Sequence, residues 1–494
     1  MKLRDLAVVR AEIDKCMKCG NCQSVCPIYF ETKKELGVAR GKLTLAQAAL
    51  EGELPVTPAF AERLSLCLTC NACVANCPSG VRFDRILLAA RAAAVKACGL
   101  PPVKKVIFAG LSHPIVFRAG LRSGRLLQPL IFKRHPRKRA NYPRFPLGLD
   151  RRRIVPPLAV RTLREELAEV NPPSDPVLNR VPNQVSNQAG QAANLTPDRA
   201  ASRPARPRMR VAFFTGCMIN YIYTETGRAV VNVLNRNGIE VVLPSEQHCC
   251  GIPVFVSGDM GTARAMAASN VRIFAGAQID AIITACATCG EAWRHHYPEL
   301  LEGAEEAEQA RELGKKHYDI SEFLVDVIGI TREPGLAGAI SSMGSTGTVG
   351  STGTVGPTTG KVTYHDPCHL NRGLGINRAP REILRAIPGV EFREMANPGR
   401  CCGGSGSFSL SYYDLSMDIA AHKVADIQKT GAETVVTGCP ACRMQIEDAL
   451  NRHQMPQRVL HTVELLEMAF EPLHDESRGI QEPRTSAFHR FLLR

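Results

Sequence analysis

Two identical cysteine motifs occupy the N-terminal part of the chain. Each reads C-x2-C-x2-C-x3-C-P, and together they supply eight thiols: Cys16, Cys19, Cys22, Cys26, Cys67, Cys70, Cys73 and Cys77. Three thiolates spaced two residues apart can lie on one tight loop and bind three irons of a four-iron cluster. The fourth cysteine lies too far along the chain to close the same cluster, so we expect it to bind the other one.

This spacing predicts two [4Fe–4S] clusters with exchanged fourth ligands, as in bacterial ferredoxins. Cluster I should use Cys16, Cys19, Cys22 and Cys77, and cluster II should use Cys67, Cys70, Cys73 and Cys26. Disulfides and structural zinc are the alternatives. Both are disfavoured because two identical motifs, each ending in Cys-Pro, are specific to clusters.

Ten further cysteines form two copies of a five-cysteine pattern. The spacings are C-x31-C-C-x35-C-x2-C and C-x32-C-C-x36-C-x2-C, which indicates an internal duplication. The first copy contains Cys217, Cys249, Cys250, Cys286 and Cys289, and the second contains Cys368, Cys401, Cys402, Cys439 and Cys442.

Five thiolates are one more than a tetrahedral zinc ion needs, so each copy favours a polynuclear iron–sulfur site. A zinc site with a spare thiol and a dithiol redox site remain open. We expect His248, His365 and His369, which flank these cysteines, to form hydrogen bonds rather than bind metal. Cys98 lies outside every motif, and we expect it to be a small buried residue.

Strand-like and helical segments alternate around each five-cysteine pattern. We expect strands at 210–215, 239–244 and 281–284 in the first copy and at 361–366, 390–395 and 434–437 in the second. We expect helices at 225–235, 262–275, 378–386 and 410–428. Each copy should therefore be a small α/β unit with a mostly parallel sheet, its cysteines at strand ends and helix starts.

The predicted fold class is a multi-domain α+β protein. A mostly helical, ferredoxin-like two-cluster domain, with helices at 36–50 and 86–95, precedes the duplicated α/β domains. The predicted divisions are 1–100 (clusters), 101–170 (basic connecting segment), 171–208 (flexible linker), 209–340 (first cysteine-rich domain), 341–360 (Gly/Ser/Thr spacer), 361–470 (second cysteine-rich domain) and 471–494 (tail).

The positive charge of the chain is concentrated in one segment. Residues 101–153 contain 14 Lys and Arg against a single acid, Asp150, whereas the whole chain has a net charge of +14. Basic residues alternate there with apolar ones in what should be short helical pieces, which favours a membrane-surface or partner-docking element. A helix pair packed on the protein's own core is the equal alternative. Nucleic acid is a weaker partner, since no binding motif accompanies the charge.

The N-terminus and the apolar runs bear on location. The first residues show no apolar signal-peptide region, so the 19 cysteines should lie in a reducing compartment, the cytoplasm. The longest uncharged stretch we identified, 106–117, is too short to span a bilayer. We therefore expect a cytoplasmic chain that could be peripheral on the cytoplasmic face of the membrane.

The motifs together resemble the iron–sulfur subunit of glycolate oxidase and of related D-lactate dehydrogenases. The segments that carry this resemblance are ARGKLTLAQAALEG (39–52), LCLTCNACVANCPSGV (66–81), HCCGIP (248–253), YHDPCHL (364–370), CCGGSGSF (401–408) and TGCPACRMQI (437–446). The duplicated pattern is similar to the CCG domains of the heterodisulfide reductase catalytic subunit. There the CCG domains hold non-cubane [4Fe–4S] clusters that cleave a disulfide, and the resemblance implies all ten matching cysteines as ligands.

The resemblance implies an electron-transfer subunit of a 2-hydroxy-acid dehydrogenase complex. A separate FAD subunit would oxidise glycolate or lactate, and this chain would pass electrons through its clusters to a quinone or another carrier. No flavin, nicotinamide or P-loop motif is visible, so we do not expect the chain to oxidise the substrate alone. The alternatives are a heterodisulfide-reductase-like subunit and the iron–sulfur subunit of an anaerobic glycerol-3-phosphate dehydrogenase.

Overall fold

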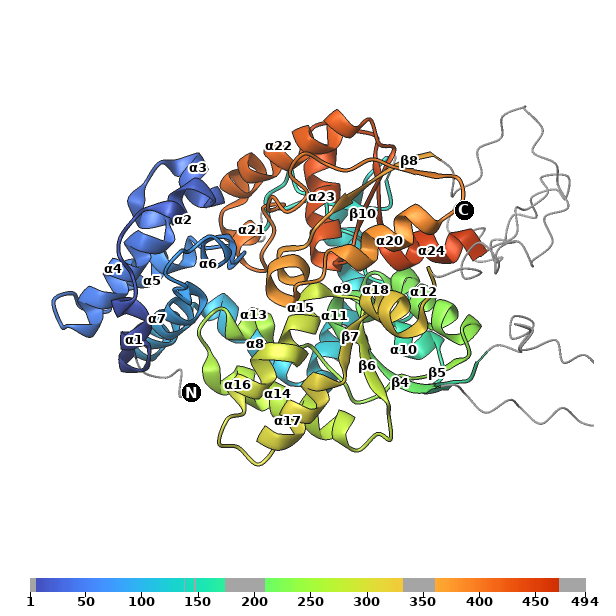
Figure 1. Cartoon of the computed structure of the whole chain (residues 1–494), viewed down its shortest axis with the longest axis horizontal. Helices are drawn as coiled ribbons and strands as arrows, with labels where there is room; N and C mark the ends of the chain where they lie inside the picture. Colours follow the sequence, from blue (N-terminus) through green and yellow to red (C-terminus); the bar gives the residue numbers. More distant parts are fainter. Residues whose placement is uncertain (1–5, 137, 146–147, 174–208, 332–359, 471–494) are drawn as a thin grey trace, which may run out of the picture.

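The computed structural model describes residues 6–173, 209–331 and 360–470, except residues 137, 146 and 147. Figure 1 shows a helical N-terminal part (blue) on the left and two α/β units, one green to yellow and one orange to red, beside it. The C-terminal tail and nearly all of the predicted linker and spacer lie outside the described residues.

The N-terminal part is helical, as predicted. Its longer helices are α4 (Ala39–Leu50), α5 (Pro58–Ser65) and α7 (Phe83–Cys98), which confirms the helices expected at 36–50 and 86–95. The shorter helices that border the cysteine loops are η1 (Leu6–Val9), α1 (Arg10–Asp14), α2 (Asn21–Ser24), α3 (Pro27–Thr32), η2 (Glu35–Gly37) and α6 (Ala72–Ala75). Leu43, Leu64 and Ile86 are buried in a common core, which holds the loops in place.

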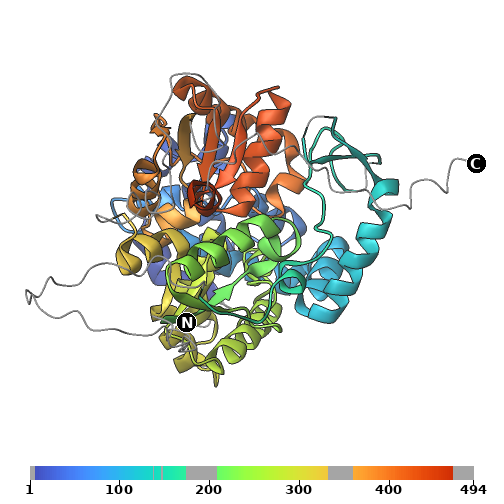
Figure 2. The same ribbon diagram turned by 90° about the vertical axis from the view of Figure 1, so that its right-hand side faces the viewer.

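The basic segment is more regular than predicted. Instead of short pieces it forms two consecutive helices, α8 (Pro102–Ser112) and α9 (Pro114–Ile131), and an antiparallel strand pair that we did not predict, β1 (Phe132–Arg134) and β2 (Asn141–Pro143). The short helix α10 (Leu163–Glu166) follows, with Thr162 and Glu165 forming a capping box. Figure 2 shows α8 and α9 in cyan at the edge of the molecule.

The first α/β unit contains a five-stranded sheet in the order β3-β5-β4-β6-β7. The strands are β3 (Val170–Asn171), β4 (Met209–Phe214), β5 (Ile239–Val242), β6 (Ala281–Thr284) and β7 (His317–Asp319). All pairings are parallel except that of β3 with β5. Asn171, which we expected to begin a flexible linker, is therefore part of an edge strand.

The helices of the first unit alternate with its strands, as expected from the sequence. They are α11 (Gly216–Tyr221), α12 (Thr224–Arg236), α13 (Ile252–Phe255), α14 (Met260–Ala275), α15 (Ala287–Glu291), η3 (Ala292–His296), α16 (Tyr297–Leu300), α17 (Ala307–Lys315), α18 (Ile320–Glu322) and η4 (Phe323–Ile328). The helices predicted at 225–235 and 262–275 correspond to α12 and α14.

The second α/β unit contains a four-stranded, wholly parallel sheet in the order β11-β10-β8-β9. Its strands are β8 (Gly360–His365), β9 (Val390–Phe392), β10 (Thr434–Thr437) and β11 (Arg458–His461). Its helices are η5 (His369–Gly373), α20 (Arg378–Ala386), α21 (Phe408–Ser411), α22 (Tyr413–Thr430), α23 (Pro440–Arg452) and α24 (Thr462–Phe470). The helix expected at 410–428 is divided at Tyr412 into α21 and α22.

The duplication read from the cysteines extends to the topology. Strands β5-β4-β6-β7 of the first unit match β9-β8-β10-β11 of the second in order and direction. In both units the first cysteine follows the central strand and the C-x2-C motif follows its neighbour. Parallel strands carry such residues to one edge of the sheet, which is where ligand sites of open α/β sheets form.

Candidate metal centres

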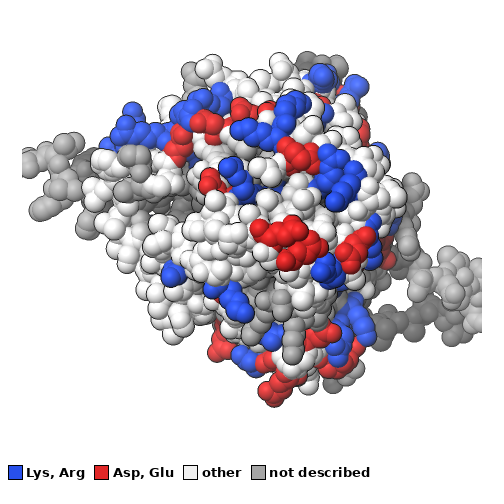
Figure 3. Space-filling view, turned by 90° about the vertical axis from the view of Figure 1, so that its left-hand side faces the viewer, with Lys and Arg blue, Asp and Glu red and all other residues white. Residues whose placement is uncertain are grey.

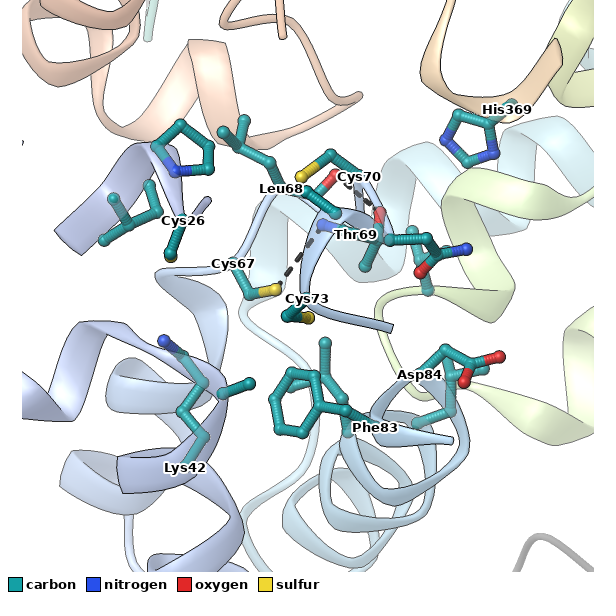
Figure 4. A pocket seen from close by; sticks show the side chains of 18 of the residues that line it. Cys26, Lys42, Cys67, Leu68, Thr69, Cys70, Cys73, Phe83, Asp84 and His369 are labelled. Carbon is teal, nitrogen blue, oxygen red and sulfur yellow. Dashed lines mark hydrogen bonds between the residues drawn. The ribbon is translucent and has the colours of Figure 1, made fainter. Parts of the chain in front are cut away.

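A cavity in the N-terminal part is lined by four cysteines from two separate stretches of the chain: Cys26, Cys67, Cys70 and Cys73. Figure 4 shows them grouped around one space, with the amino group of Lys42 pointing toward them. The backbone N–H of Thr69 donates a hydrogen bond of 3.5 Å to the sulfur of Cys67. These are the four residues assigned to cluster II.

A second cavity next to the first is lined by Cys16, Cys19, Cys22 and Cys77. The backbone N–H of Val81 donates a hydrogen bond of 3.4 Å to the sulfur of Cys77. Cys73 lines this cavity as well as the first one, so the two spaces adjoin. The structure thus brings Cys77 to the loop of the first motif and Cys26 to the loop of the second.

The donor chemistry of both cavities fits a four-iron cluster. Burial raises the pKa of Cys26 to about 11 and raises the pKa of Cys73 well above its usual value. Such thiols lose their protons only when a cation binds the sulfur, which is what the iron of a cluster does. The grouping is that of the crossed assignment, and iron binding by these eight residues stays a prediction.

The five cysteines of the first α/β unit meet at the carboxyl ends of β4 and β6. The thiols of Cys217 and Cys249 are in contact, and so are those of Cys250 and Cys289 and those of Cys286 and Cys289. Gly216 has a φ of 59°, and a Cβ atom there would lie 2.9 Å from the sulfur of Cys289. Glycine therefore lets the backbone pass close to this thiol.

The second α/β unit repeats the arrangement with Cys368, Cys401, Cys402, Cys439 and Cys442. A side chain at Gly403, whose φ is 81°, would collide with the carbonyl oxygen of Ser416. His365 adds a sixth donor, because its ring nitrogen and the sulfurs of Cys402 and Cys442 lie within 4.8 Å of one another. Each unit therefore offers more thiols than a single tetrahedral ion uses, which fits a polynuclear cluster.

The two five-thiol sites differ in the charge of their surroundings. Asn270 of α14 and Lys423 of α22 occupy corresponding positions, each seven residues after a residue that faces the glycine of its Cys-Cys-Gly turn. The side-chain amide of Asn270 donates to the carbonyl oxygen of Cys249 at 3.1 Å. Lys423 is buried, and its amine donates to the carbonyl oxygens of Asn397 and Pro398 at 2.7 and 3.0 Å. Burial lowers the pKa of Lys423 to about 8.

Contacts between thiols connect the sites to one another. Cys70 of the N-terminal part touches Cys401 of the second α/β unit, and this contact lowers the pKa of Cys70 to about 6. Cys439 of the second unit touches Cys286 of the first. With the adjoining cavities of the N-terminal part, the four groups of cysteines form one unbroken series.

Ionisable residues that we did not predict lie beside this series. Glu291 is buried between the units, accepts a hydrogen bond from Nδ1 of His369 and lies 3.9 Å from Nε2 of His296. Although burial raises the pKa of Glu291, His369 and His296 lower it well below its usual value. The sequence signal was an acid two residues after Cys289 in an otherwise apolar stretch.

Lys42 is a second residue that we did not single out. It is 1% exposed, donates to the carbonyl oxygen of Gly37 and faces Cys26 and Cys67. Burial lowers its pKa. The sequence signal was a lysine within the apolar stripe of the helix predicted at 36–50, where it shares a face with Ala39 and Ala46.

Two expectations about single residues have clear outcomes. His248 forms hydrogen bonds, as expected, at 3.0 Å to Ser269 and 3.3 Å to the carbonyl oxygen of Cys249. The expectation for Cys98 was wrong. Cys98 is exposed at the end of α7, with its sulfur 3.6 Å from the carbonyl oxygen of Val56, because the following turn leads the chain away from the core.

Comparisons with known protein families match the two kinds of cysteine motif separately. A 4Fe-4S dicluster domain matches residues 12–81, and a cysteine-rich domain, CCG, matches twice, at residues 211–292 and 362–447. The matched ranges contain all eighteen cysteines of the motifs.

Curated relatives match long stretches of the chain. A probable glycolate oxidase iron–sulfur subunit of Bacillus subtilis (strain 168) is 29% identical over 92% of this chain and 93% of its own length. Lactate utilization protein A of Geobacillus kaustophilus is 32% identical over 52% of this chain and 98% of its own length. A fumarate reductase (CoM/CoB) subunit of Methanothermobacter marburgensis is 34% identical over 53% of this chain, which spans about half (47%) of that relative.

Proposed function

Because this chain belongs to the family of glycolate oxidase and lactate utilization iron–sulfur subunits, we propose that it is the electron-carrying subunit of a flavin-dependent 2-hydroxy-acid dehydrogenase complex. In this proposal a partner FAD subunit oxidises glycolate or lactate. This chain receives the electrons and passes them to a quinone or another carrier.

The observation that carries the proposal is the unbroken series of thiol groups. Iron–sulfur clusters supply one-electron carriage when bound. The contacts between Cys70 and Cys401 and between Cys439 and Cys286 would place neighbouring clusters side by side from the N-terminal part to the first α/β unit. Protein residues bury the sulfurs, donate N–H groups to them and set the nearby charge, which together determine the potentials.

A cavity beside the series supports a small acceptor molecule. Its volume is about 510 Å³, and it is lined by Cys67, Arg91, Lys104 and Tyr412 among others. Volumes of this size are usual for small-molecule sites. Arg91 donates to the carbonyl oxygen of Cys67 at 3.1 Å, and the hydroxyls of Ser65 and Tyr412 form a hydrogen bond of 2.6 Å. An acceptor bound here would lie next to a predicted ligand of cluster II.

Anoxic reduction by a partner tests the proposal. The chain is purified from its host without oxygen, and the flavoprotein that accompanies it is identified. Glycolate or lactate should then bleach the visible absorption of the clusters only when that flavoprotein is present. Sn-glycerol 3-phosphate serves as the matched substrate for the glycerol-3-phosphate alternative. Bleaching by none of the three substrates with the flavoprotein bound would sink the proposal.

Disulfide reduction is the second candidate, and the meeting of the two five-thiol sites favours it. Cys286 and Cys439 bring the predicted clusters of both units together, as a two-cluster disulfide site would need. The Methanothermobacter relative matches over the same kind of domains. If chemically reduced protein converts an added disulfide to thiols while its clusters reoxidise, this candidate replaces the first. We expect no such reaction.

A further inference from the structure

Helices α8 and α9, which we call the exposed helix pair, carry an unusual number of solvent-exposed apolar side chains. Their exposed fractions range from 48% to 83%, and the residues are Val103, Val106, Ile107, Ile115, Val116, Leu126, Leu127 and Leu130. Single exposed apolar residues are ordinary, but a contiguous group marks a surface that meets something else.

These side chains point away from the protein because the opposite faces of both helices are already packed. Phe108 and Leu111 of α8 are buried, and the ring of Phe117 of α9 meets the edge of Tyr221 at 5.3 Å. At 100° per residue, Ile115, Leu126 and Leu130 fall on the side of α9 opposite Phe117. An amphipathic helix normally turns its apolar stripe inward, whereas α9 also presents one outward.

Basic side chains border the outward stripe. Arg118, Arg122 and Arg125 lie on one flank of α9, and Lys133 and Arg134 follow directly in β1, both exposed. Arg122 is held by Glu165 at 2.5 Å, and Arg125 donates to the carbonyl oxygen of Val160. The face in Figure 3, by contrast, has acidic and basic side chains interspersed.

The length of the helices favours the surface of a bilayer over its interior. Among the described helices, no single one combines the length and apolar composition needed to cross a membrane, and α7 and α8, which would suffice only together, are bent by 111°. Amphipathic helices with apolar side chains on one side and Lys and Arg beside them lie in the interface of anionic membranes.

We infer that the exposed helix pair docks on an anionic phospholipid bilayer, with its outward apolar side chains among the lipid headgroups and its basic residues on the lipid charges. Two components on one face, apolar area and positive charge, match the two components of that surface. Lys104 at the start of α8 also lines the cavity beside Cys67, so docking would bring that cavity close to membrane-dissolved acceptors.

Vesicle sedimentation of the full-length, cluster-loaded protein tests the inference. The vesicles are phosphatidylcholine alone or phosphatidylcholine mixed with phosphatidylglycerol. We expect binding to the mixed vesicles at about 0.1 M salt and release at about 1 M, where the Debye length falls from about 10 Å to about 3 Å.

Two double variants separate the contributions. Lys133→Gln with Arg134→Gln should weaken binding by about 30-fold. Leu126→Ser with Leu130→Ser should weaken it by about tenfold or more. All four residues are exposed, so iron content and cluster spectra should stay unchanged. The control is Leu410→Ser, an exposed leucine of the second α/β unit, which should bind like the wild type.

Two outcomes would overturn the inference. Wild-type protein that stays in the supernatant with mixed vesicles at low salt excludes a membrane. If the leucine variant then also loses the partner flavoprotein, the surface is a protein-docking face. Equal binding to neutral and anionic vesicles would exclude a role for the charge. Reduction of the clusters by the flavoprotein is measured without vesicles, so this test can fail while the proposed function stands.

Discussion

At the scale of single residues, the exchange of Cys26 and Cys77 between the two cysteine loops determines how the N-terminal sites are built. Each of these residues precedes a proline, which directs the chain away from its own loop. Cys26 then lines the cavity of the second motif and Cys77 that of the first.

Replacing Cys77 with Ser should therefore damage the cluster bound by Cys16, Cys19 and Cys22. The reason is that Cys77 supplies the fourth thiolate of that cluster and not of its own. Electron paramagnetic resonance of the reduced protein would show loss or change of one four-iron signal. Cys26→Ser is the matched variant and should affect the other signal. Damage to only the Cys67 cluster in the Cys77 variant would contradict the exchanged assignment.

A second residue-scale prediction concerns the buried amine of Lys423. A positive charge near a cluster stabilises its reduced, more negative form. Lys423→Met should therefore lower the reduction potential of the site in the second α/β unit. An effect on the order of 1 kcal/mol corresponds to about 40 mV for a one-electron couple.

Redox titration followed by electron paramagnetic resonance measures this shift. Lys429→Met is the control, because Lys429 belongs to the same helix, carries the same charge and is exposed. The signal assigned to the first α/β unit, which has Asn270 at the corresponding place, should not move. Equal potentials in wild type and Lys423 variant would refute the electrostatic role.

At the scale of elements, one buried arginine fastens the basic segment to the second α/β unit. Arg153 is 2% exposed, donates to the carbonyl oxygen of Ser409 at 2.9 Å and lies 3.9 Å from Asp448. The backbone N–H of Ile154 donates to the same aspartate at 2.9 Å. Burial raises the pKa of Asp448 to about 6. Removing the arginine would leave these buried groups without their partner.

Arg153→Met should reduce the stability of the protein by about 3 kcal/mol, the usual cost of breaking a buried charged pair. The neighbouring Arg152 offers a matched control. It is bonded to Asp150 and Asp414 but is 41% exposed, so Arg152→Met should cost no more than about 1 kcal/mol. Thermal unfolding of both variants under anoxic conditions decides the point. Equal unfolding midpoints would show that Arg153 does not anchor the segment.

At the scale of the whole molecule, the structure joins three units through cysteine side chains. The contacts between Cys70 and Cys401 and between Cys286 and Cys439 each cross a boundary between units. The units are therefore adjacent where their sites are, which is what electron transfer between clusters would require.

We predict about 16 iron atoms per chain after anoxic purification, from four four-iron clusters. Metal analysis by plasma emission with sulfide determination measures this number. Iron near half that value together with stoichiometric zinc would reassign the duplicated units to zinc and confine the clusters to the N-terminal part.

The sequence alone determined the features that depend on local spacing. The helices at 36–50 and 86–95, the strands of both sheets and the duplication were predictable, because hydrophobic periodicity and cysteine spacing act over a few residues. The same reasoning predicted the exchange of Cys26 and Cys77, since a short loop cannot close a cluster with its own fourth cysteine.

Only the tertiary structure decided how distant parts meet. The neighbours of Cys70 and Glu291 come from other units. Periodicity also showed that α9 is amphipathic but not that Leu126 and Leu130 face outward, because an apolar stripe has the same pattern whether it is covered or bare. Packing assigns such positions through contacts between residues far apart in the chain, which local patterns do not contain.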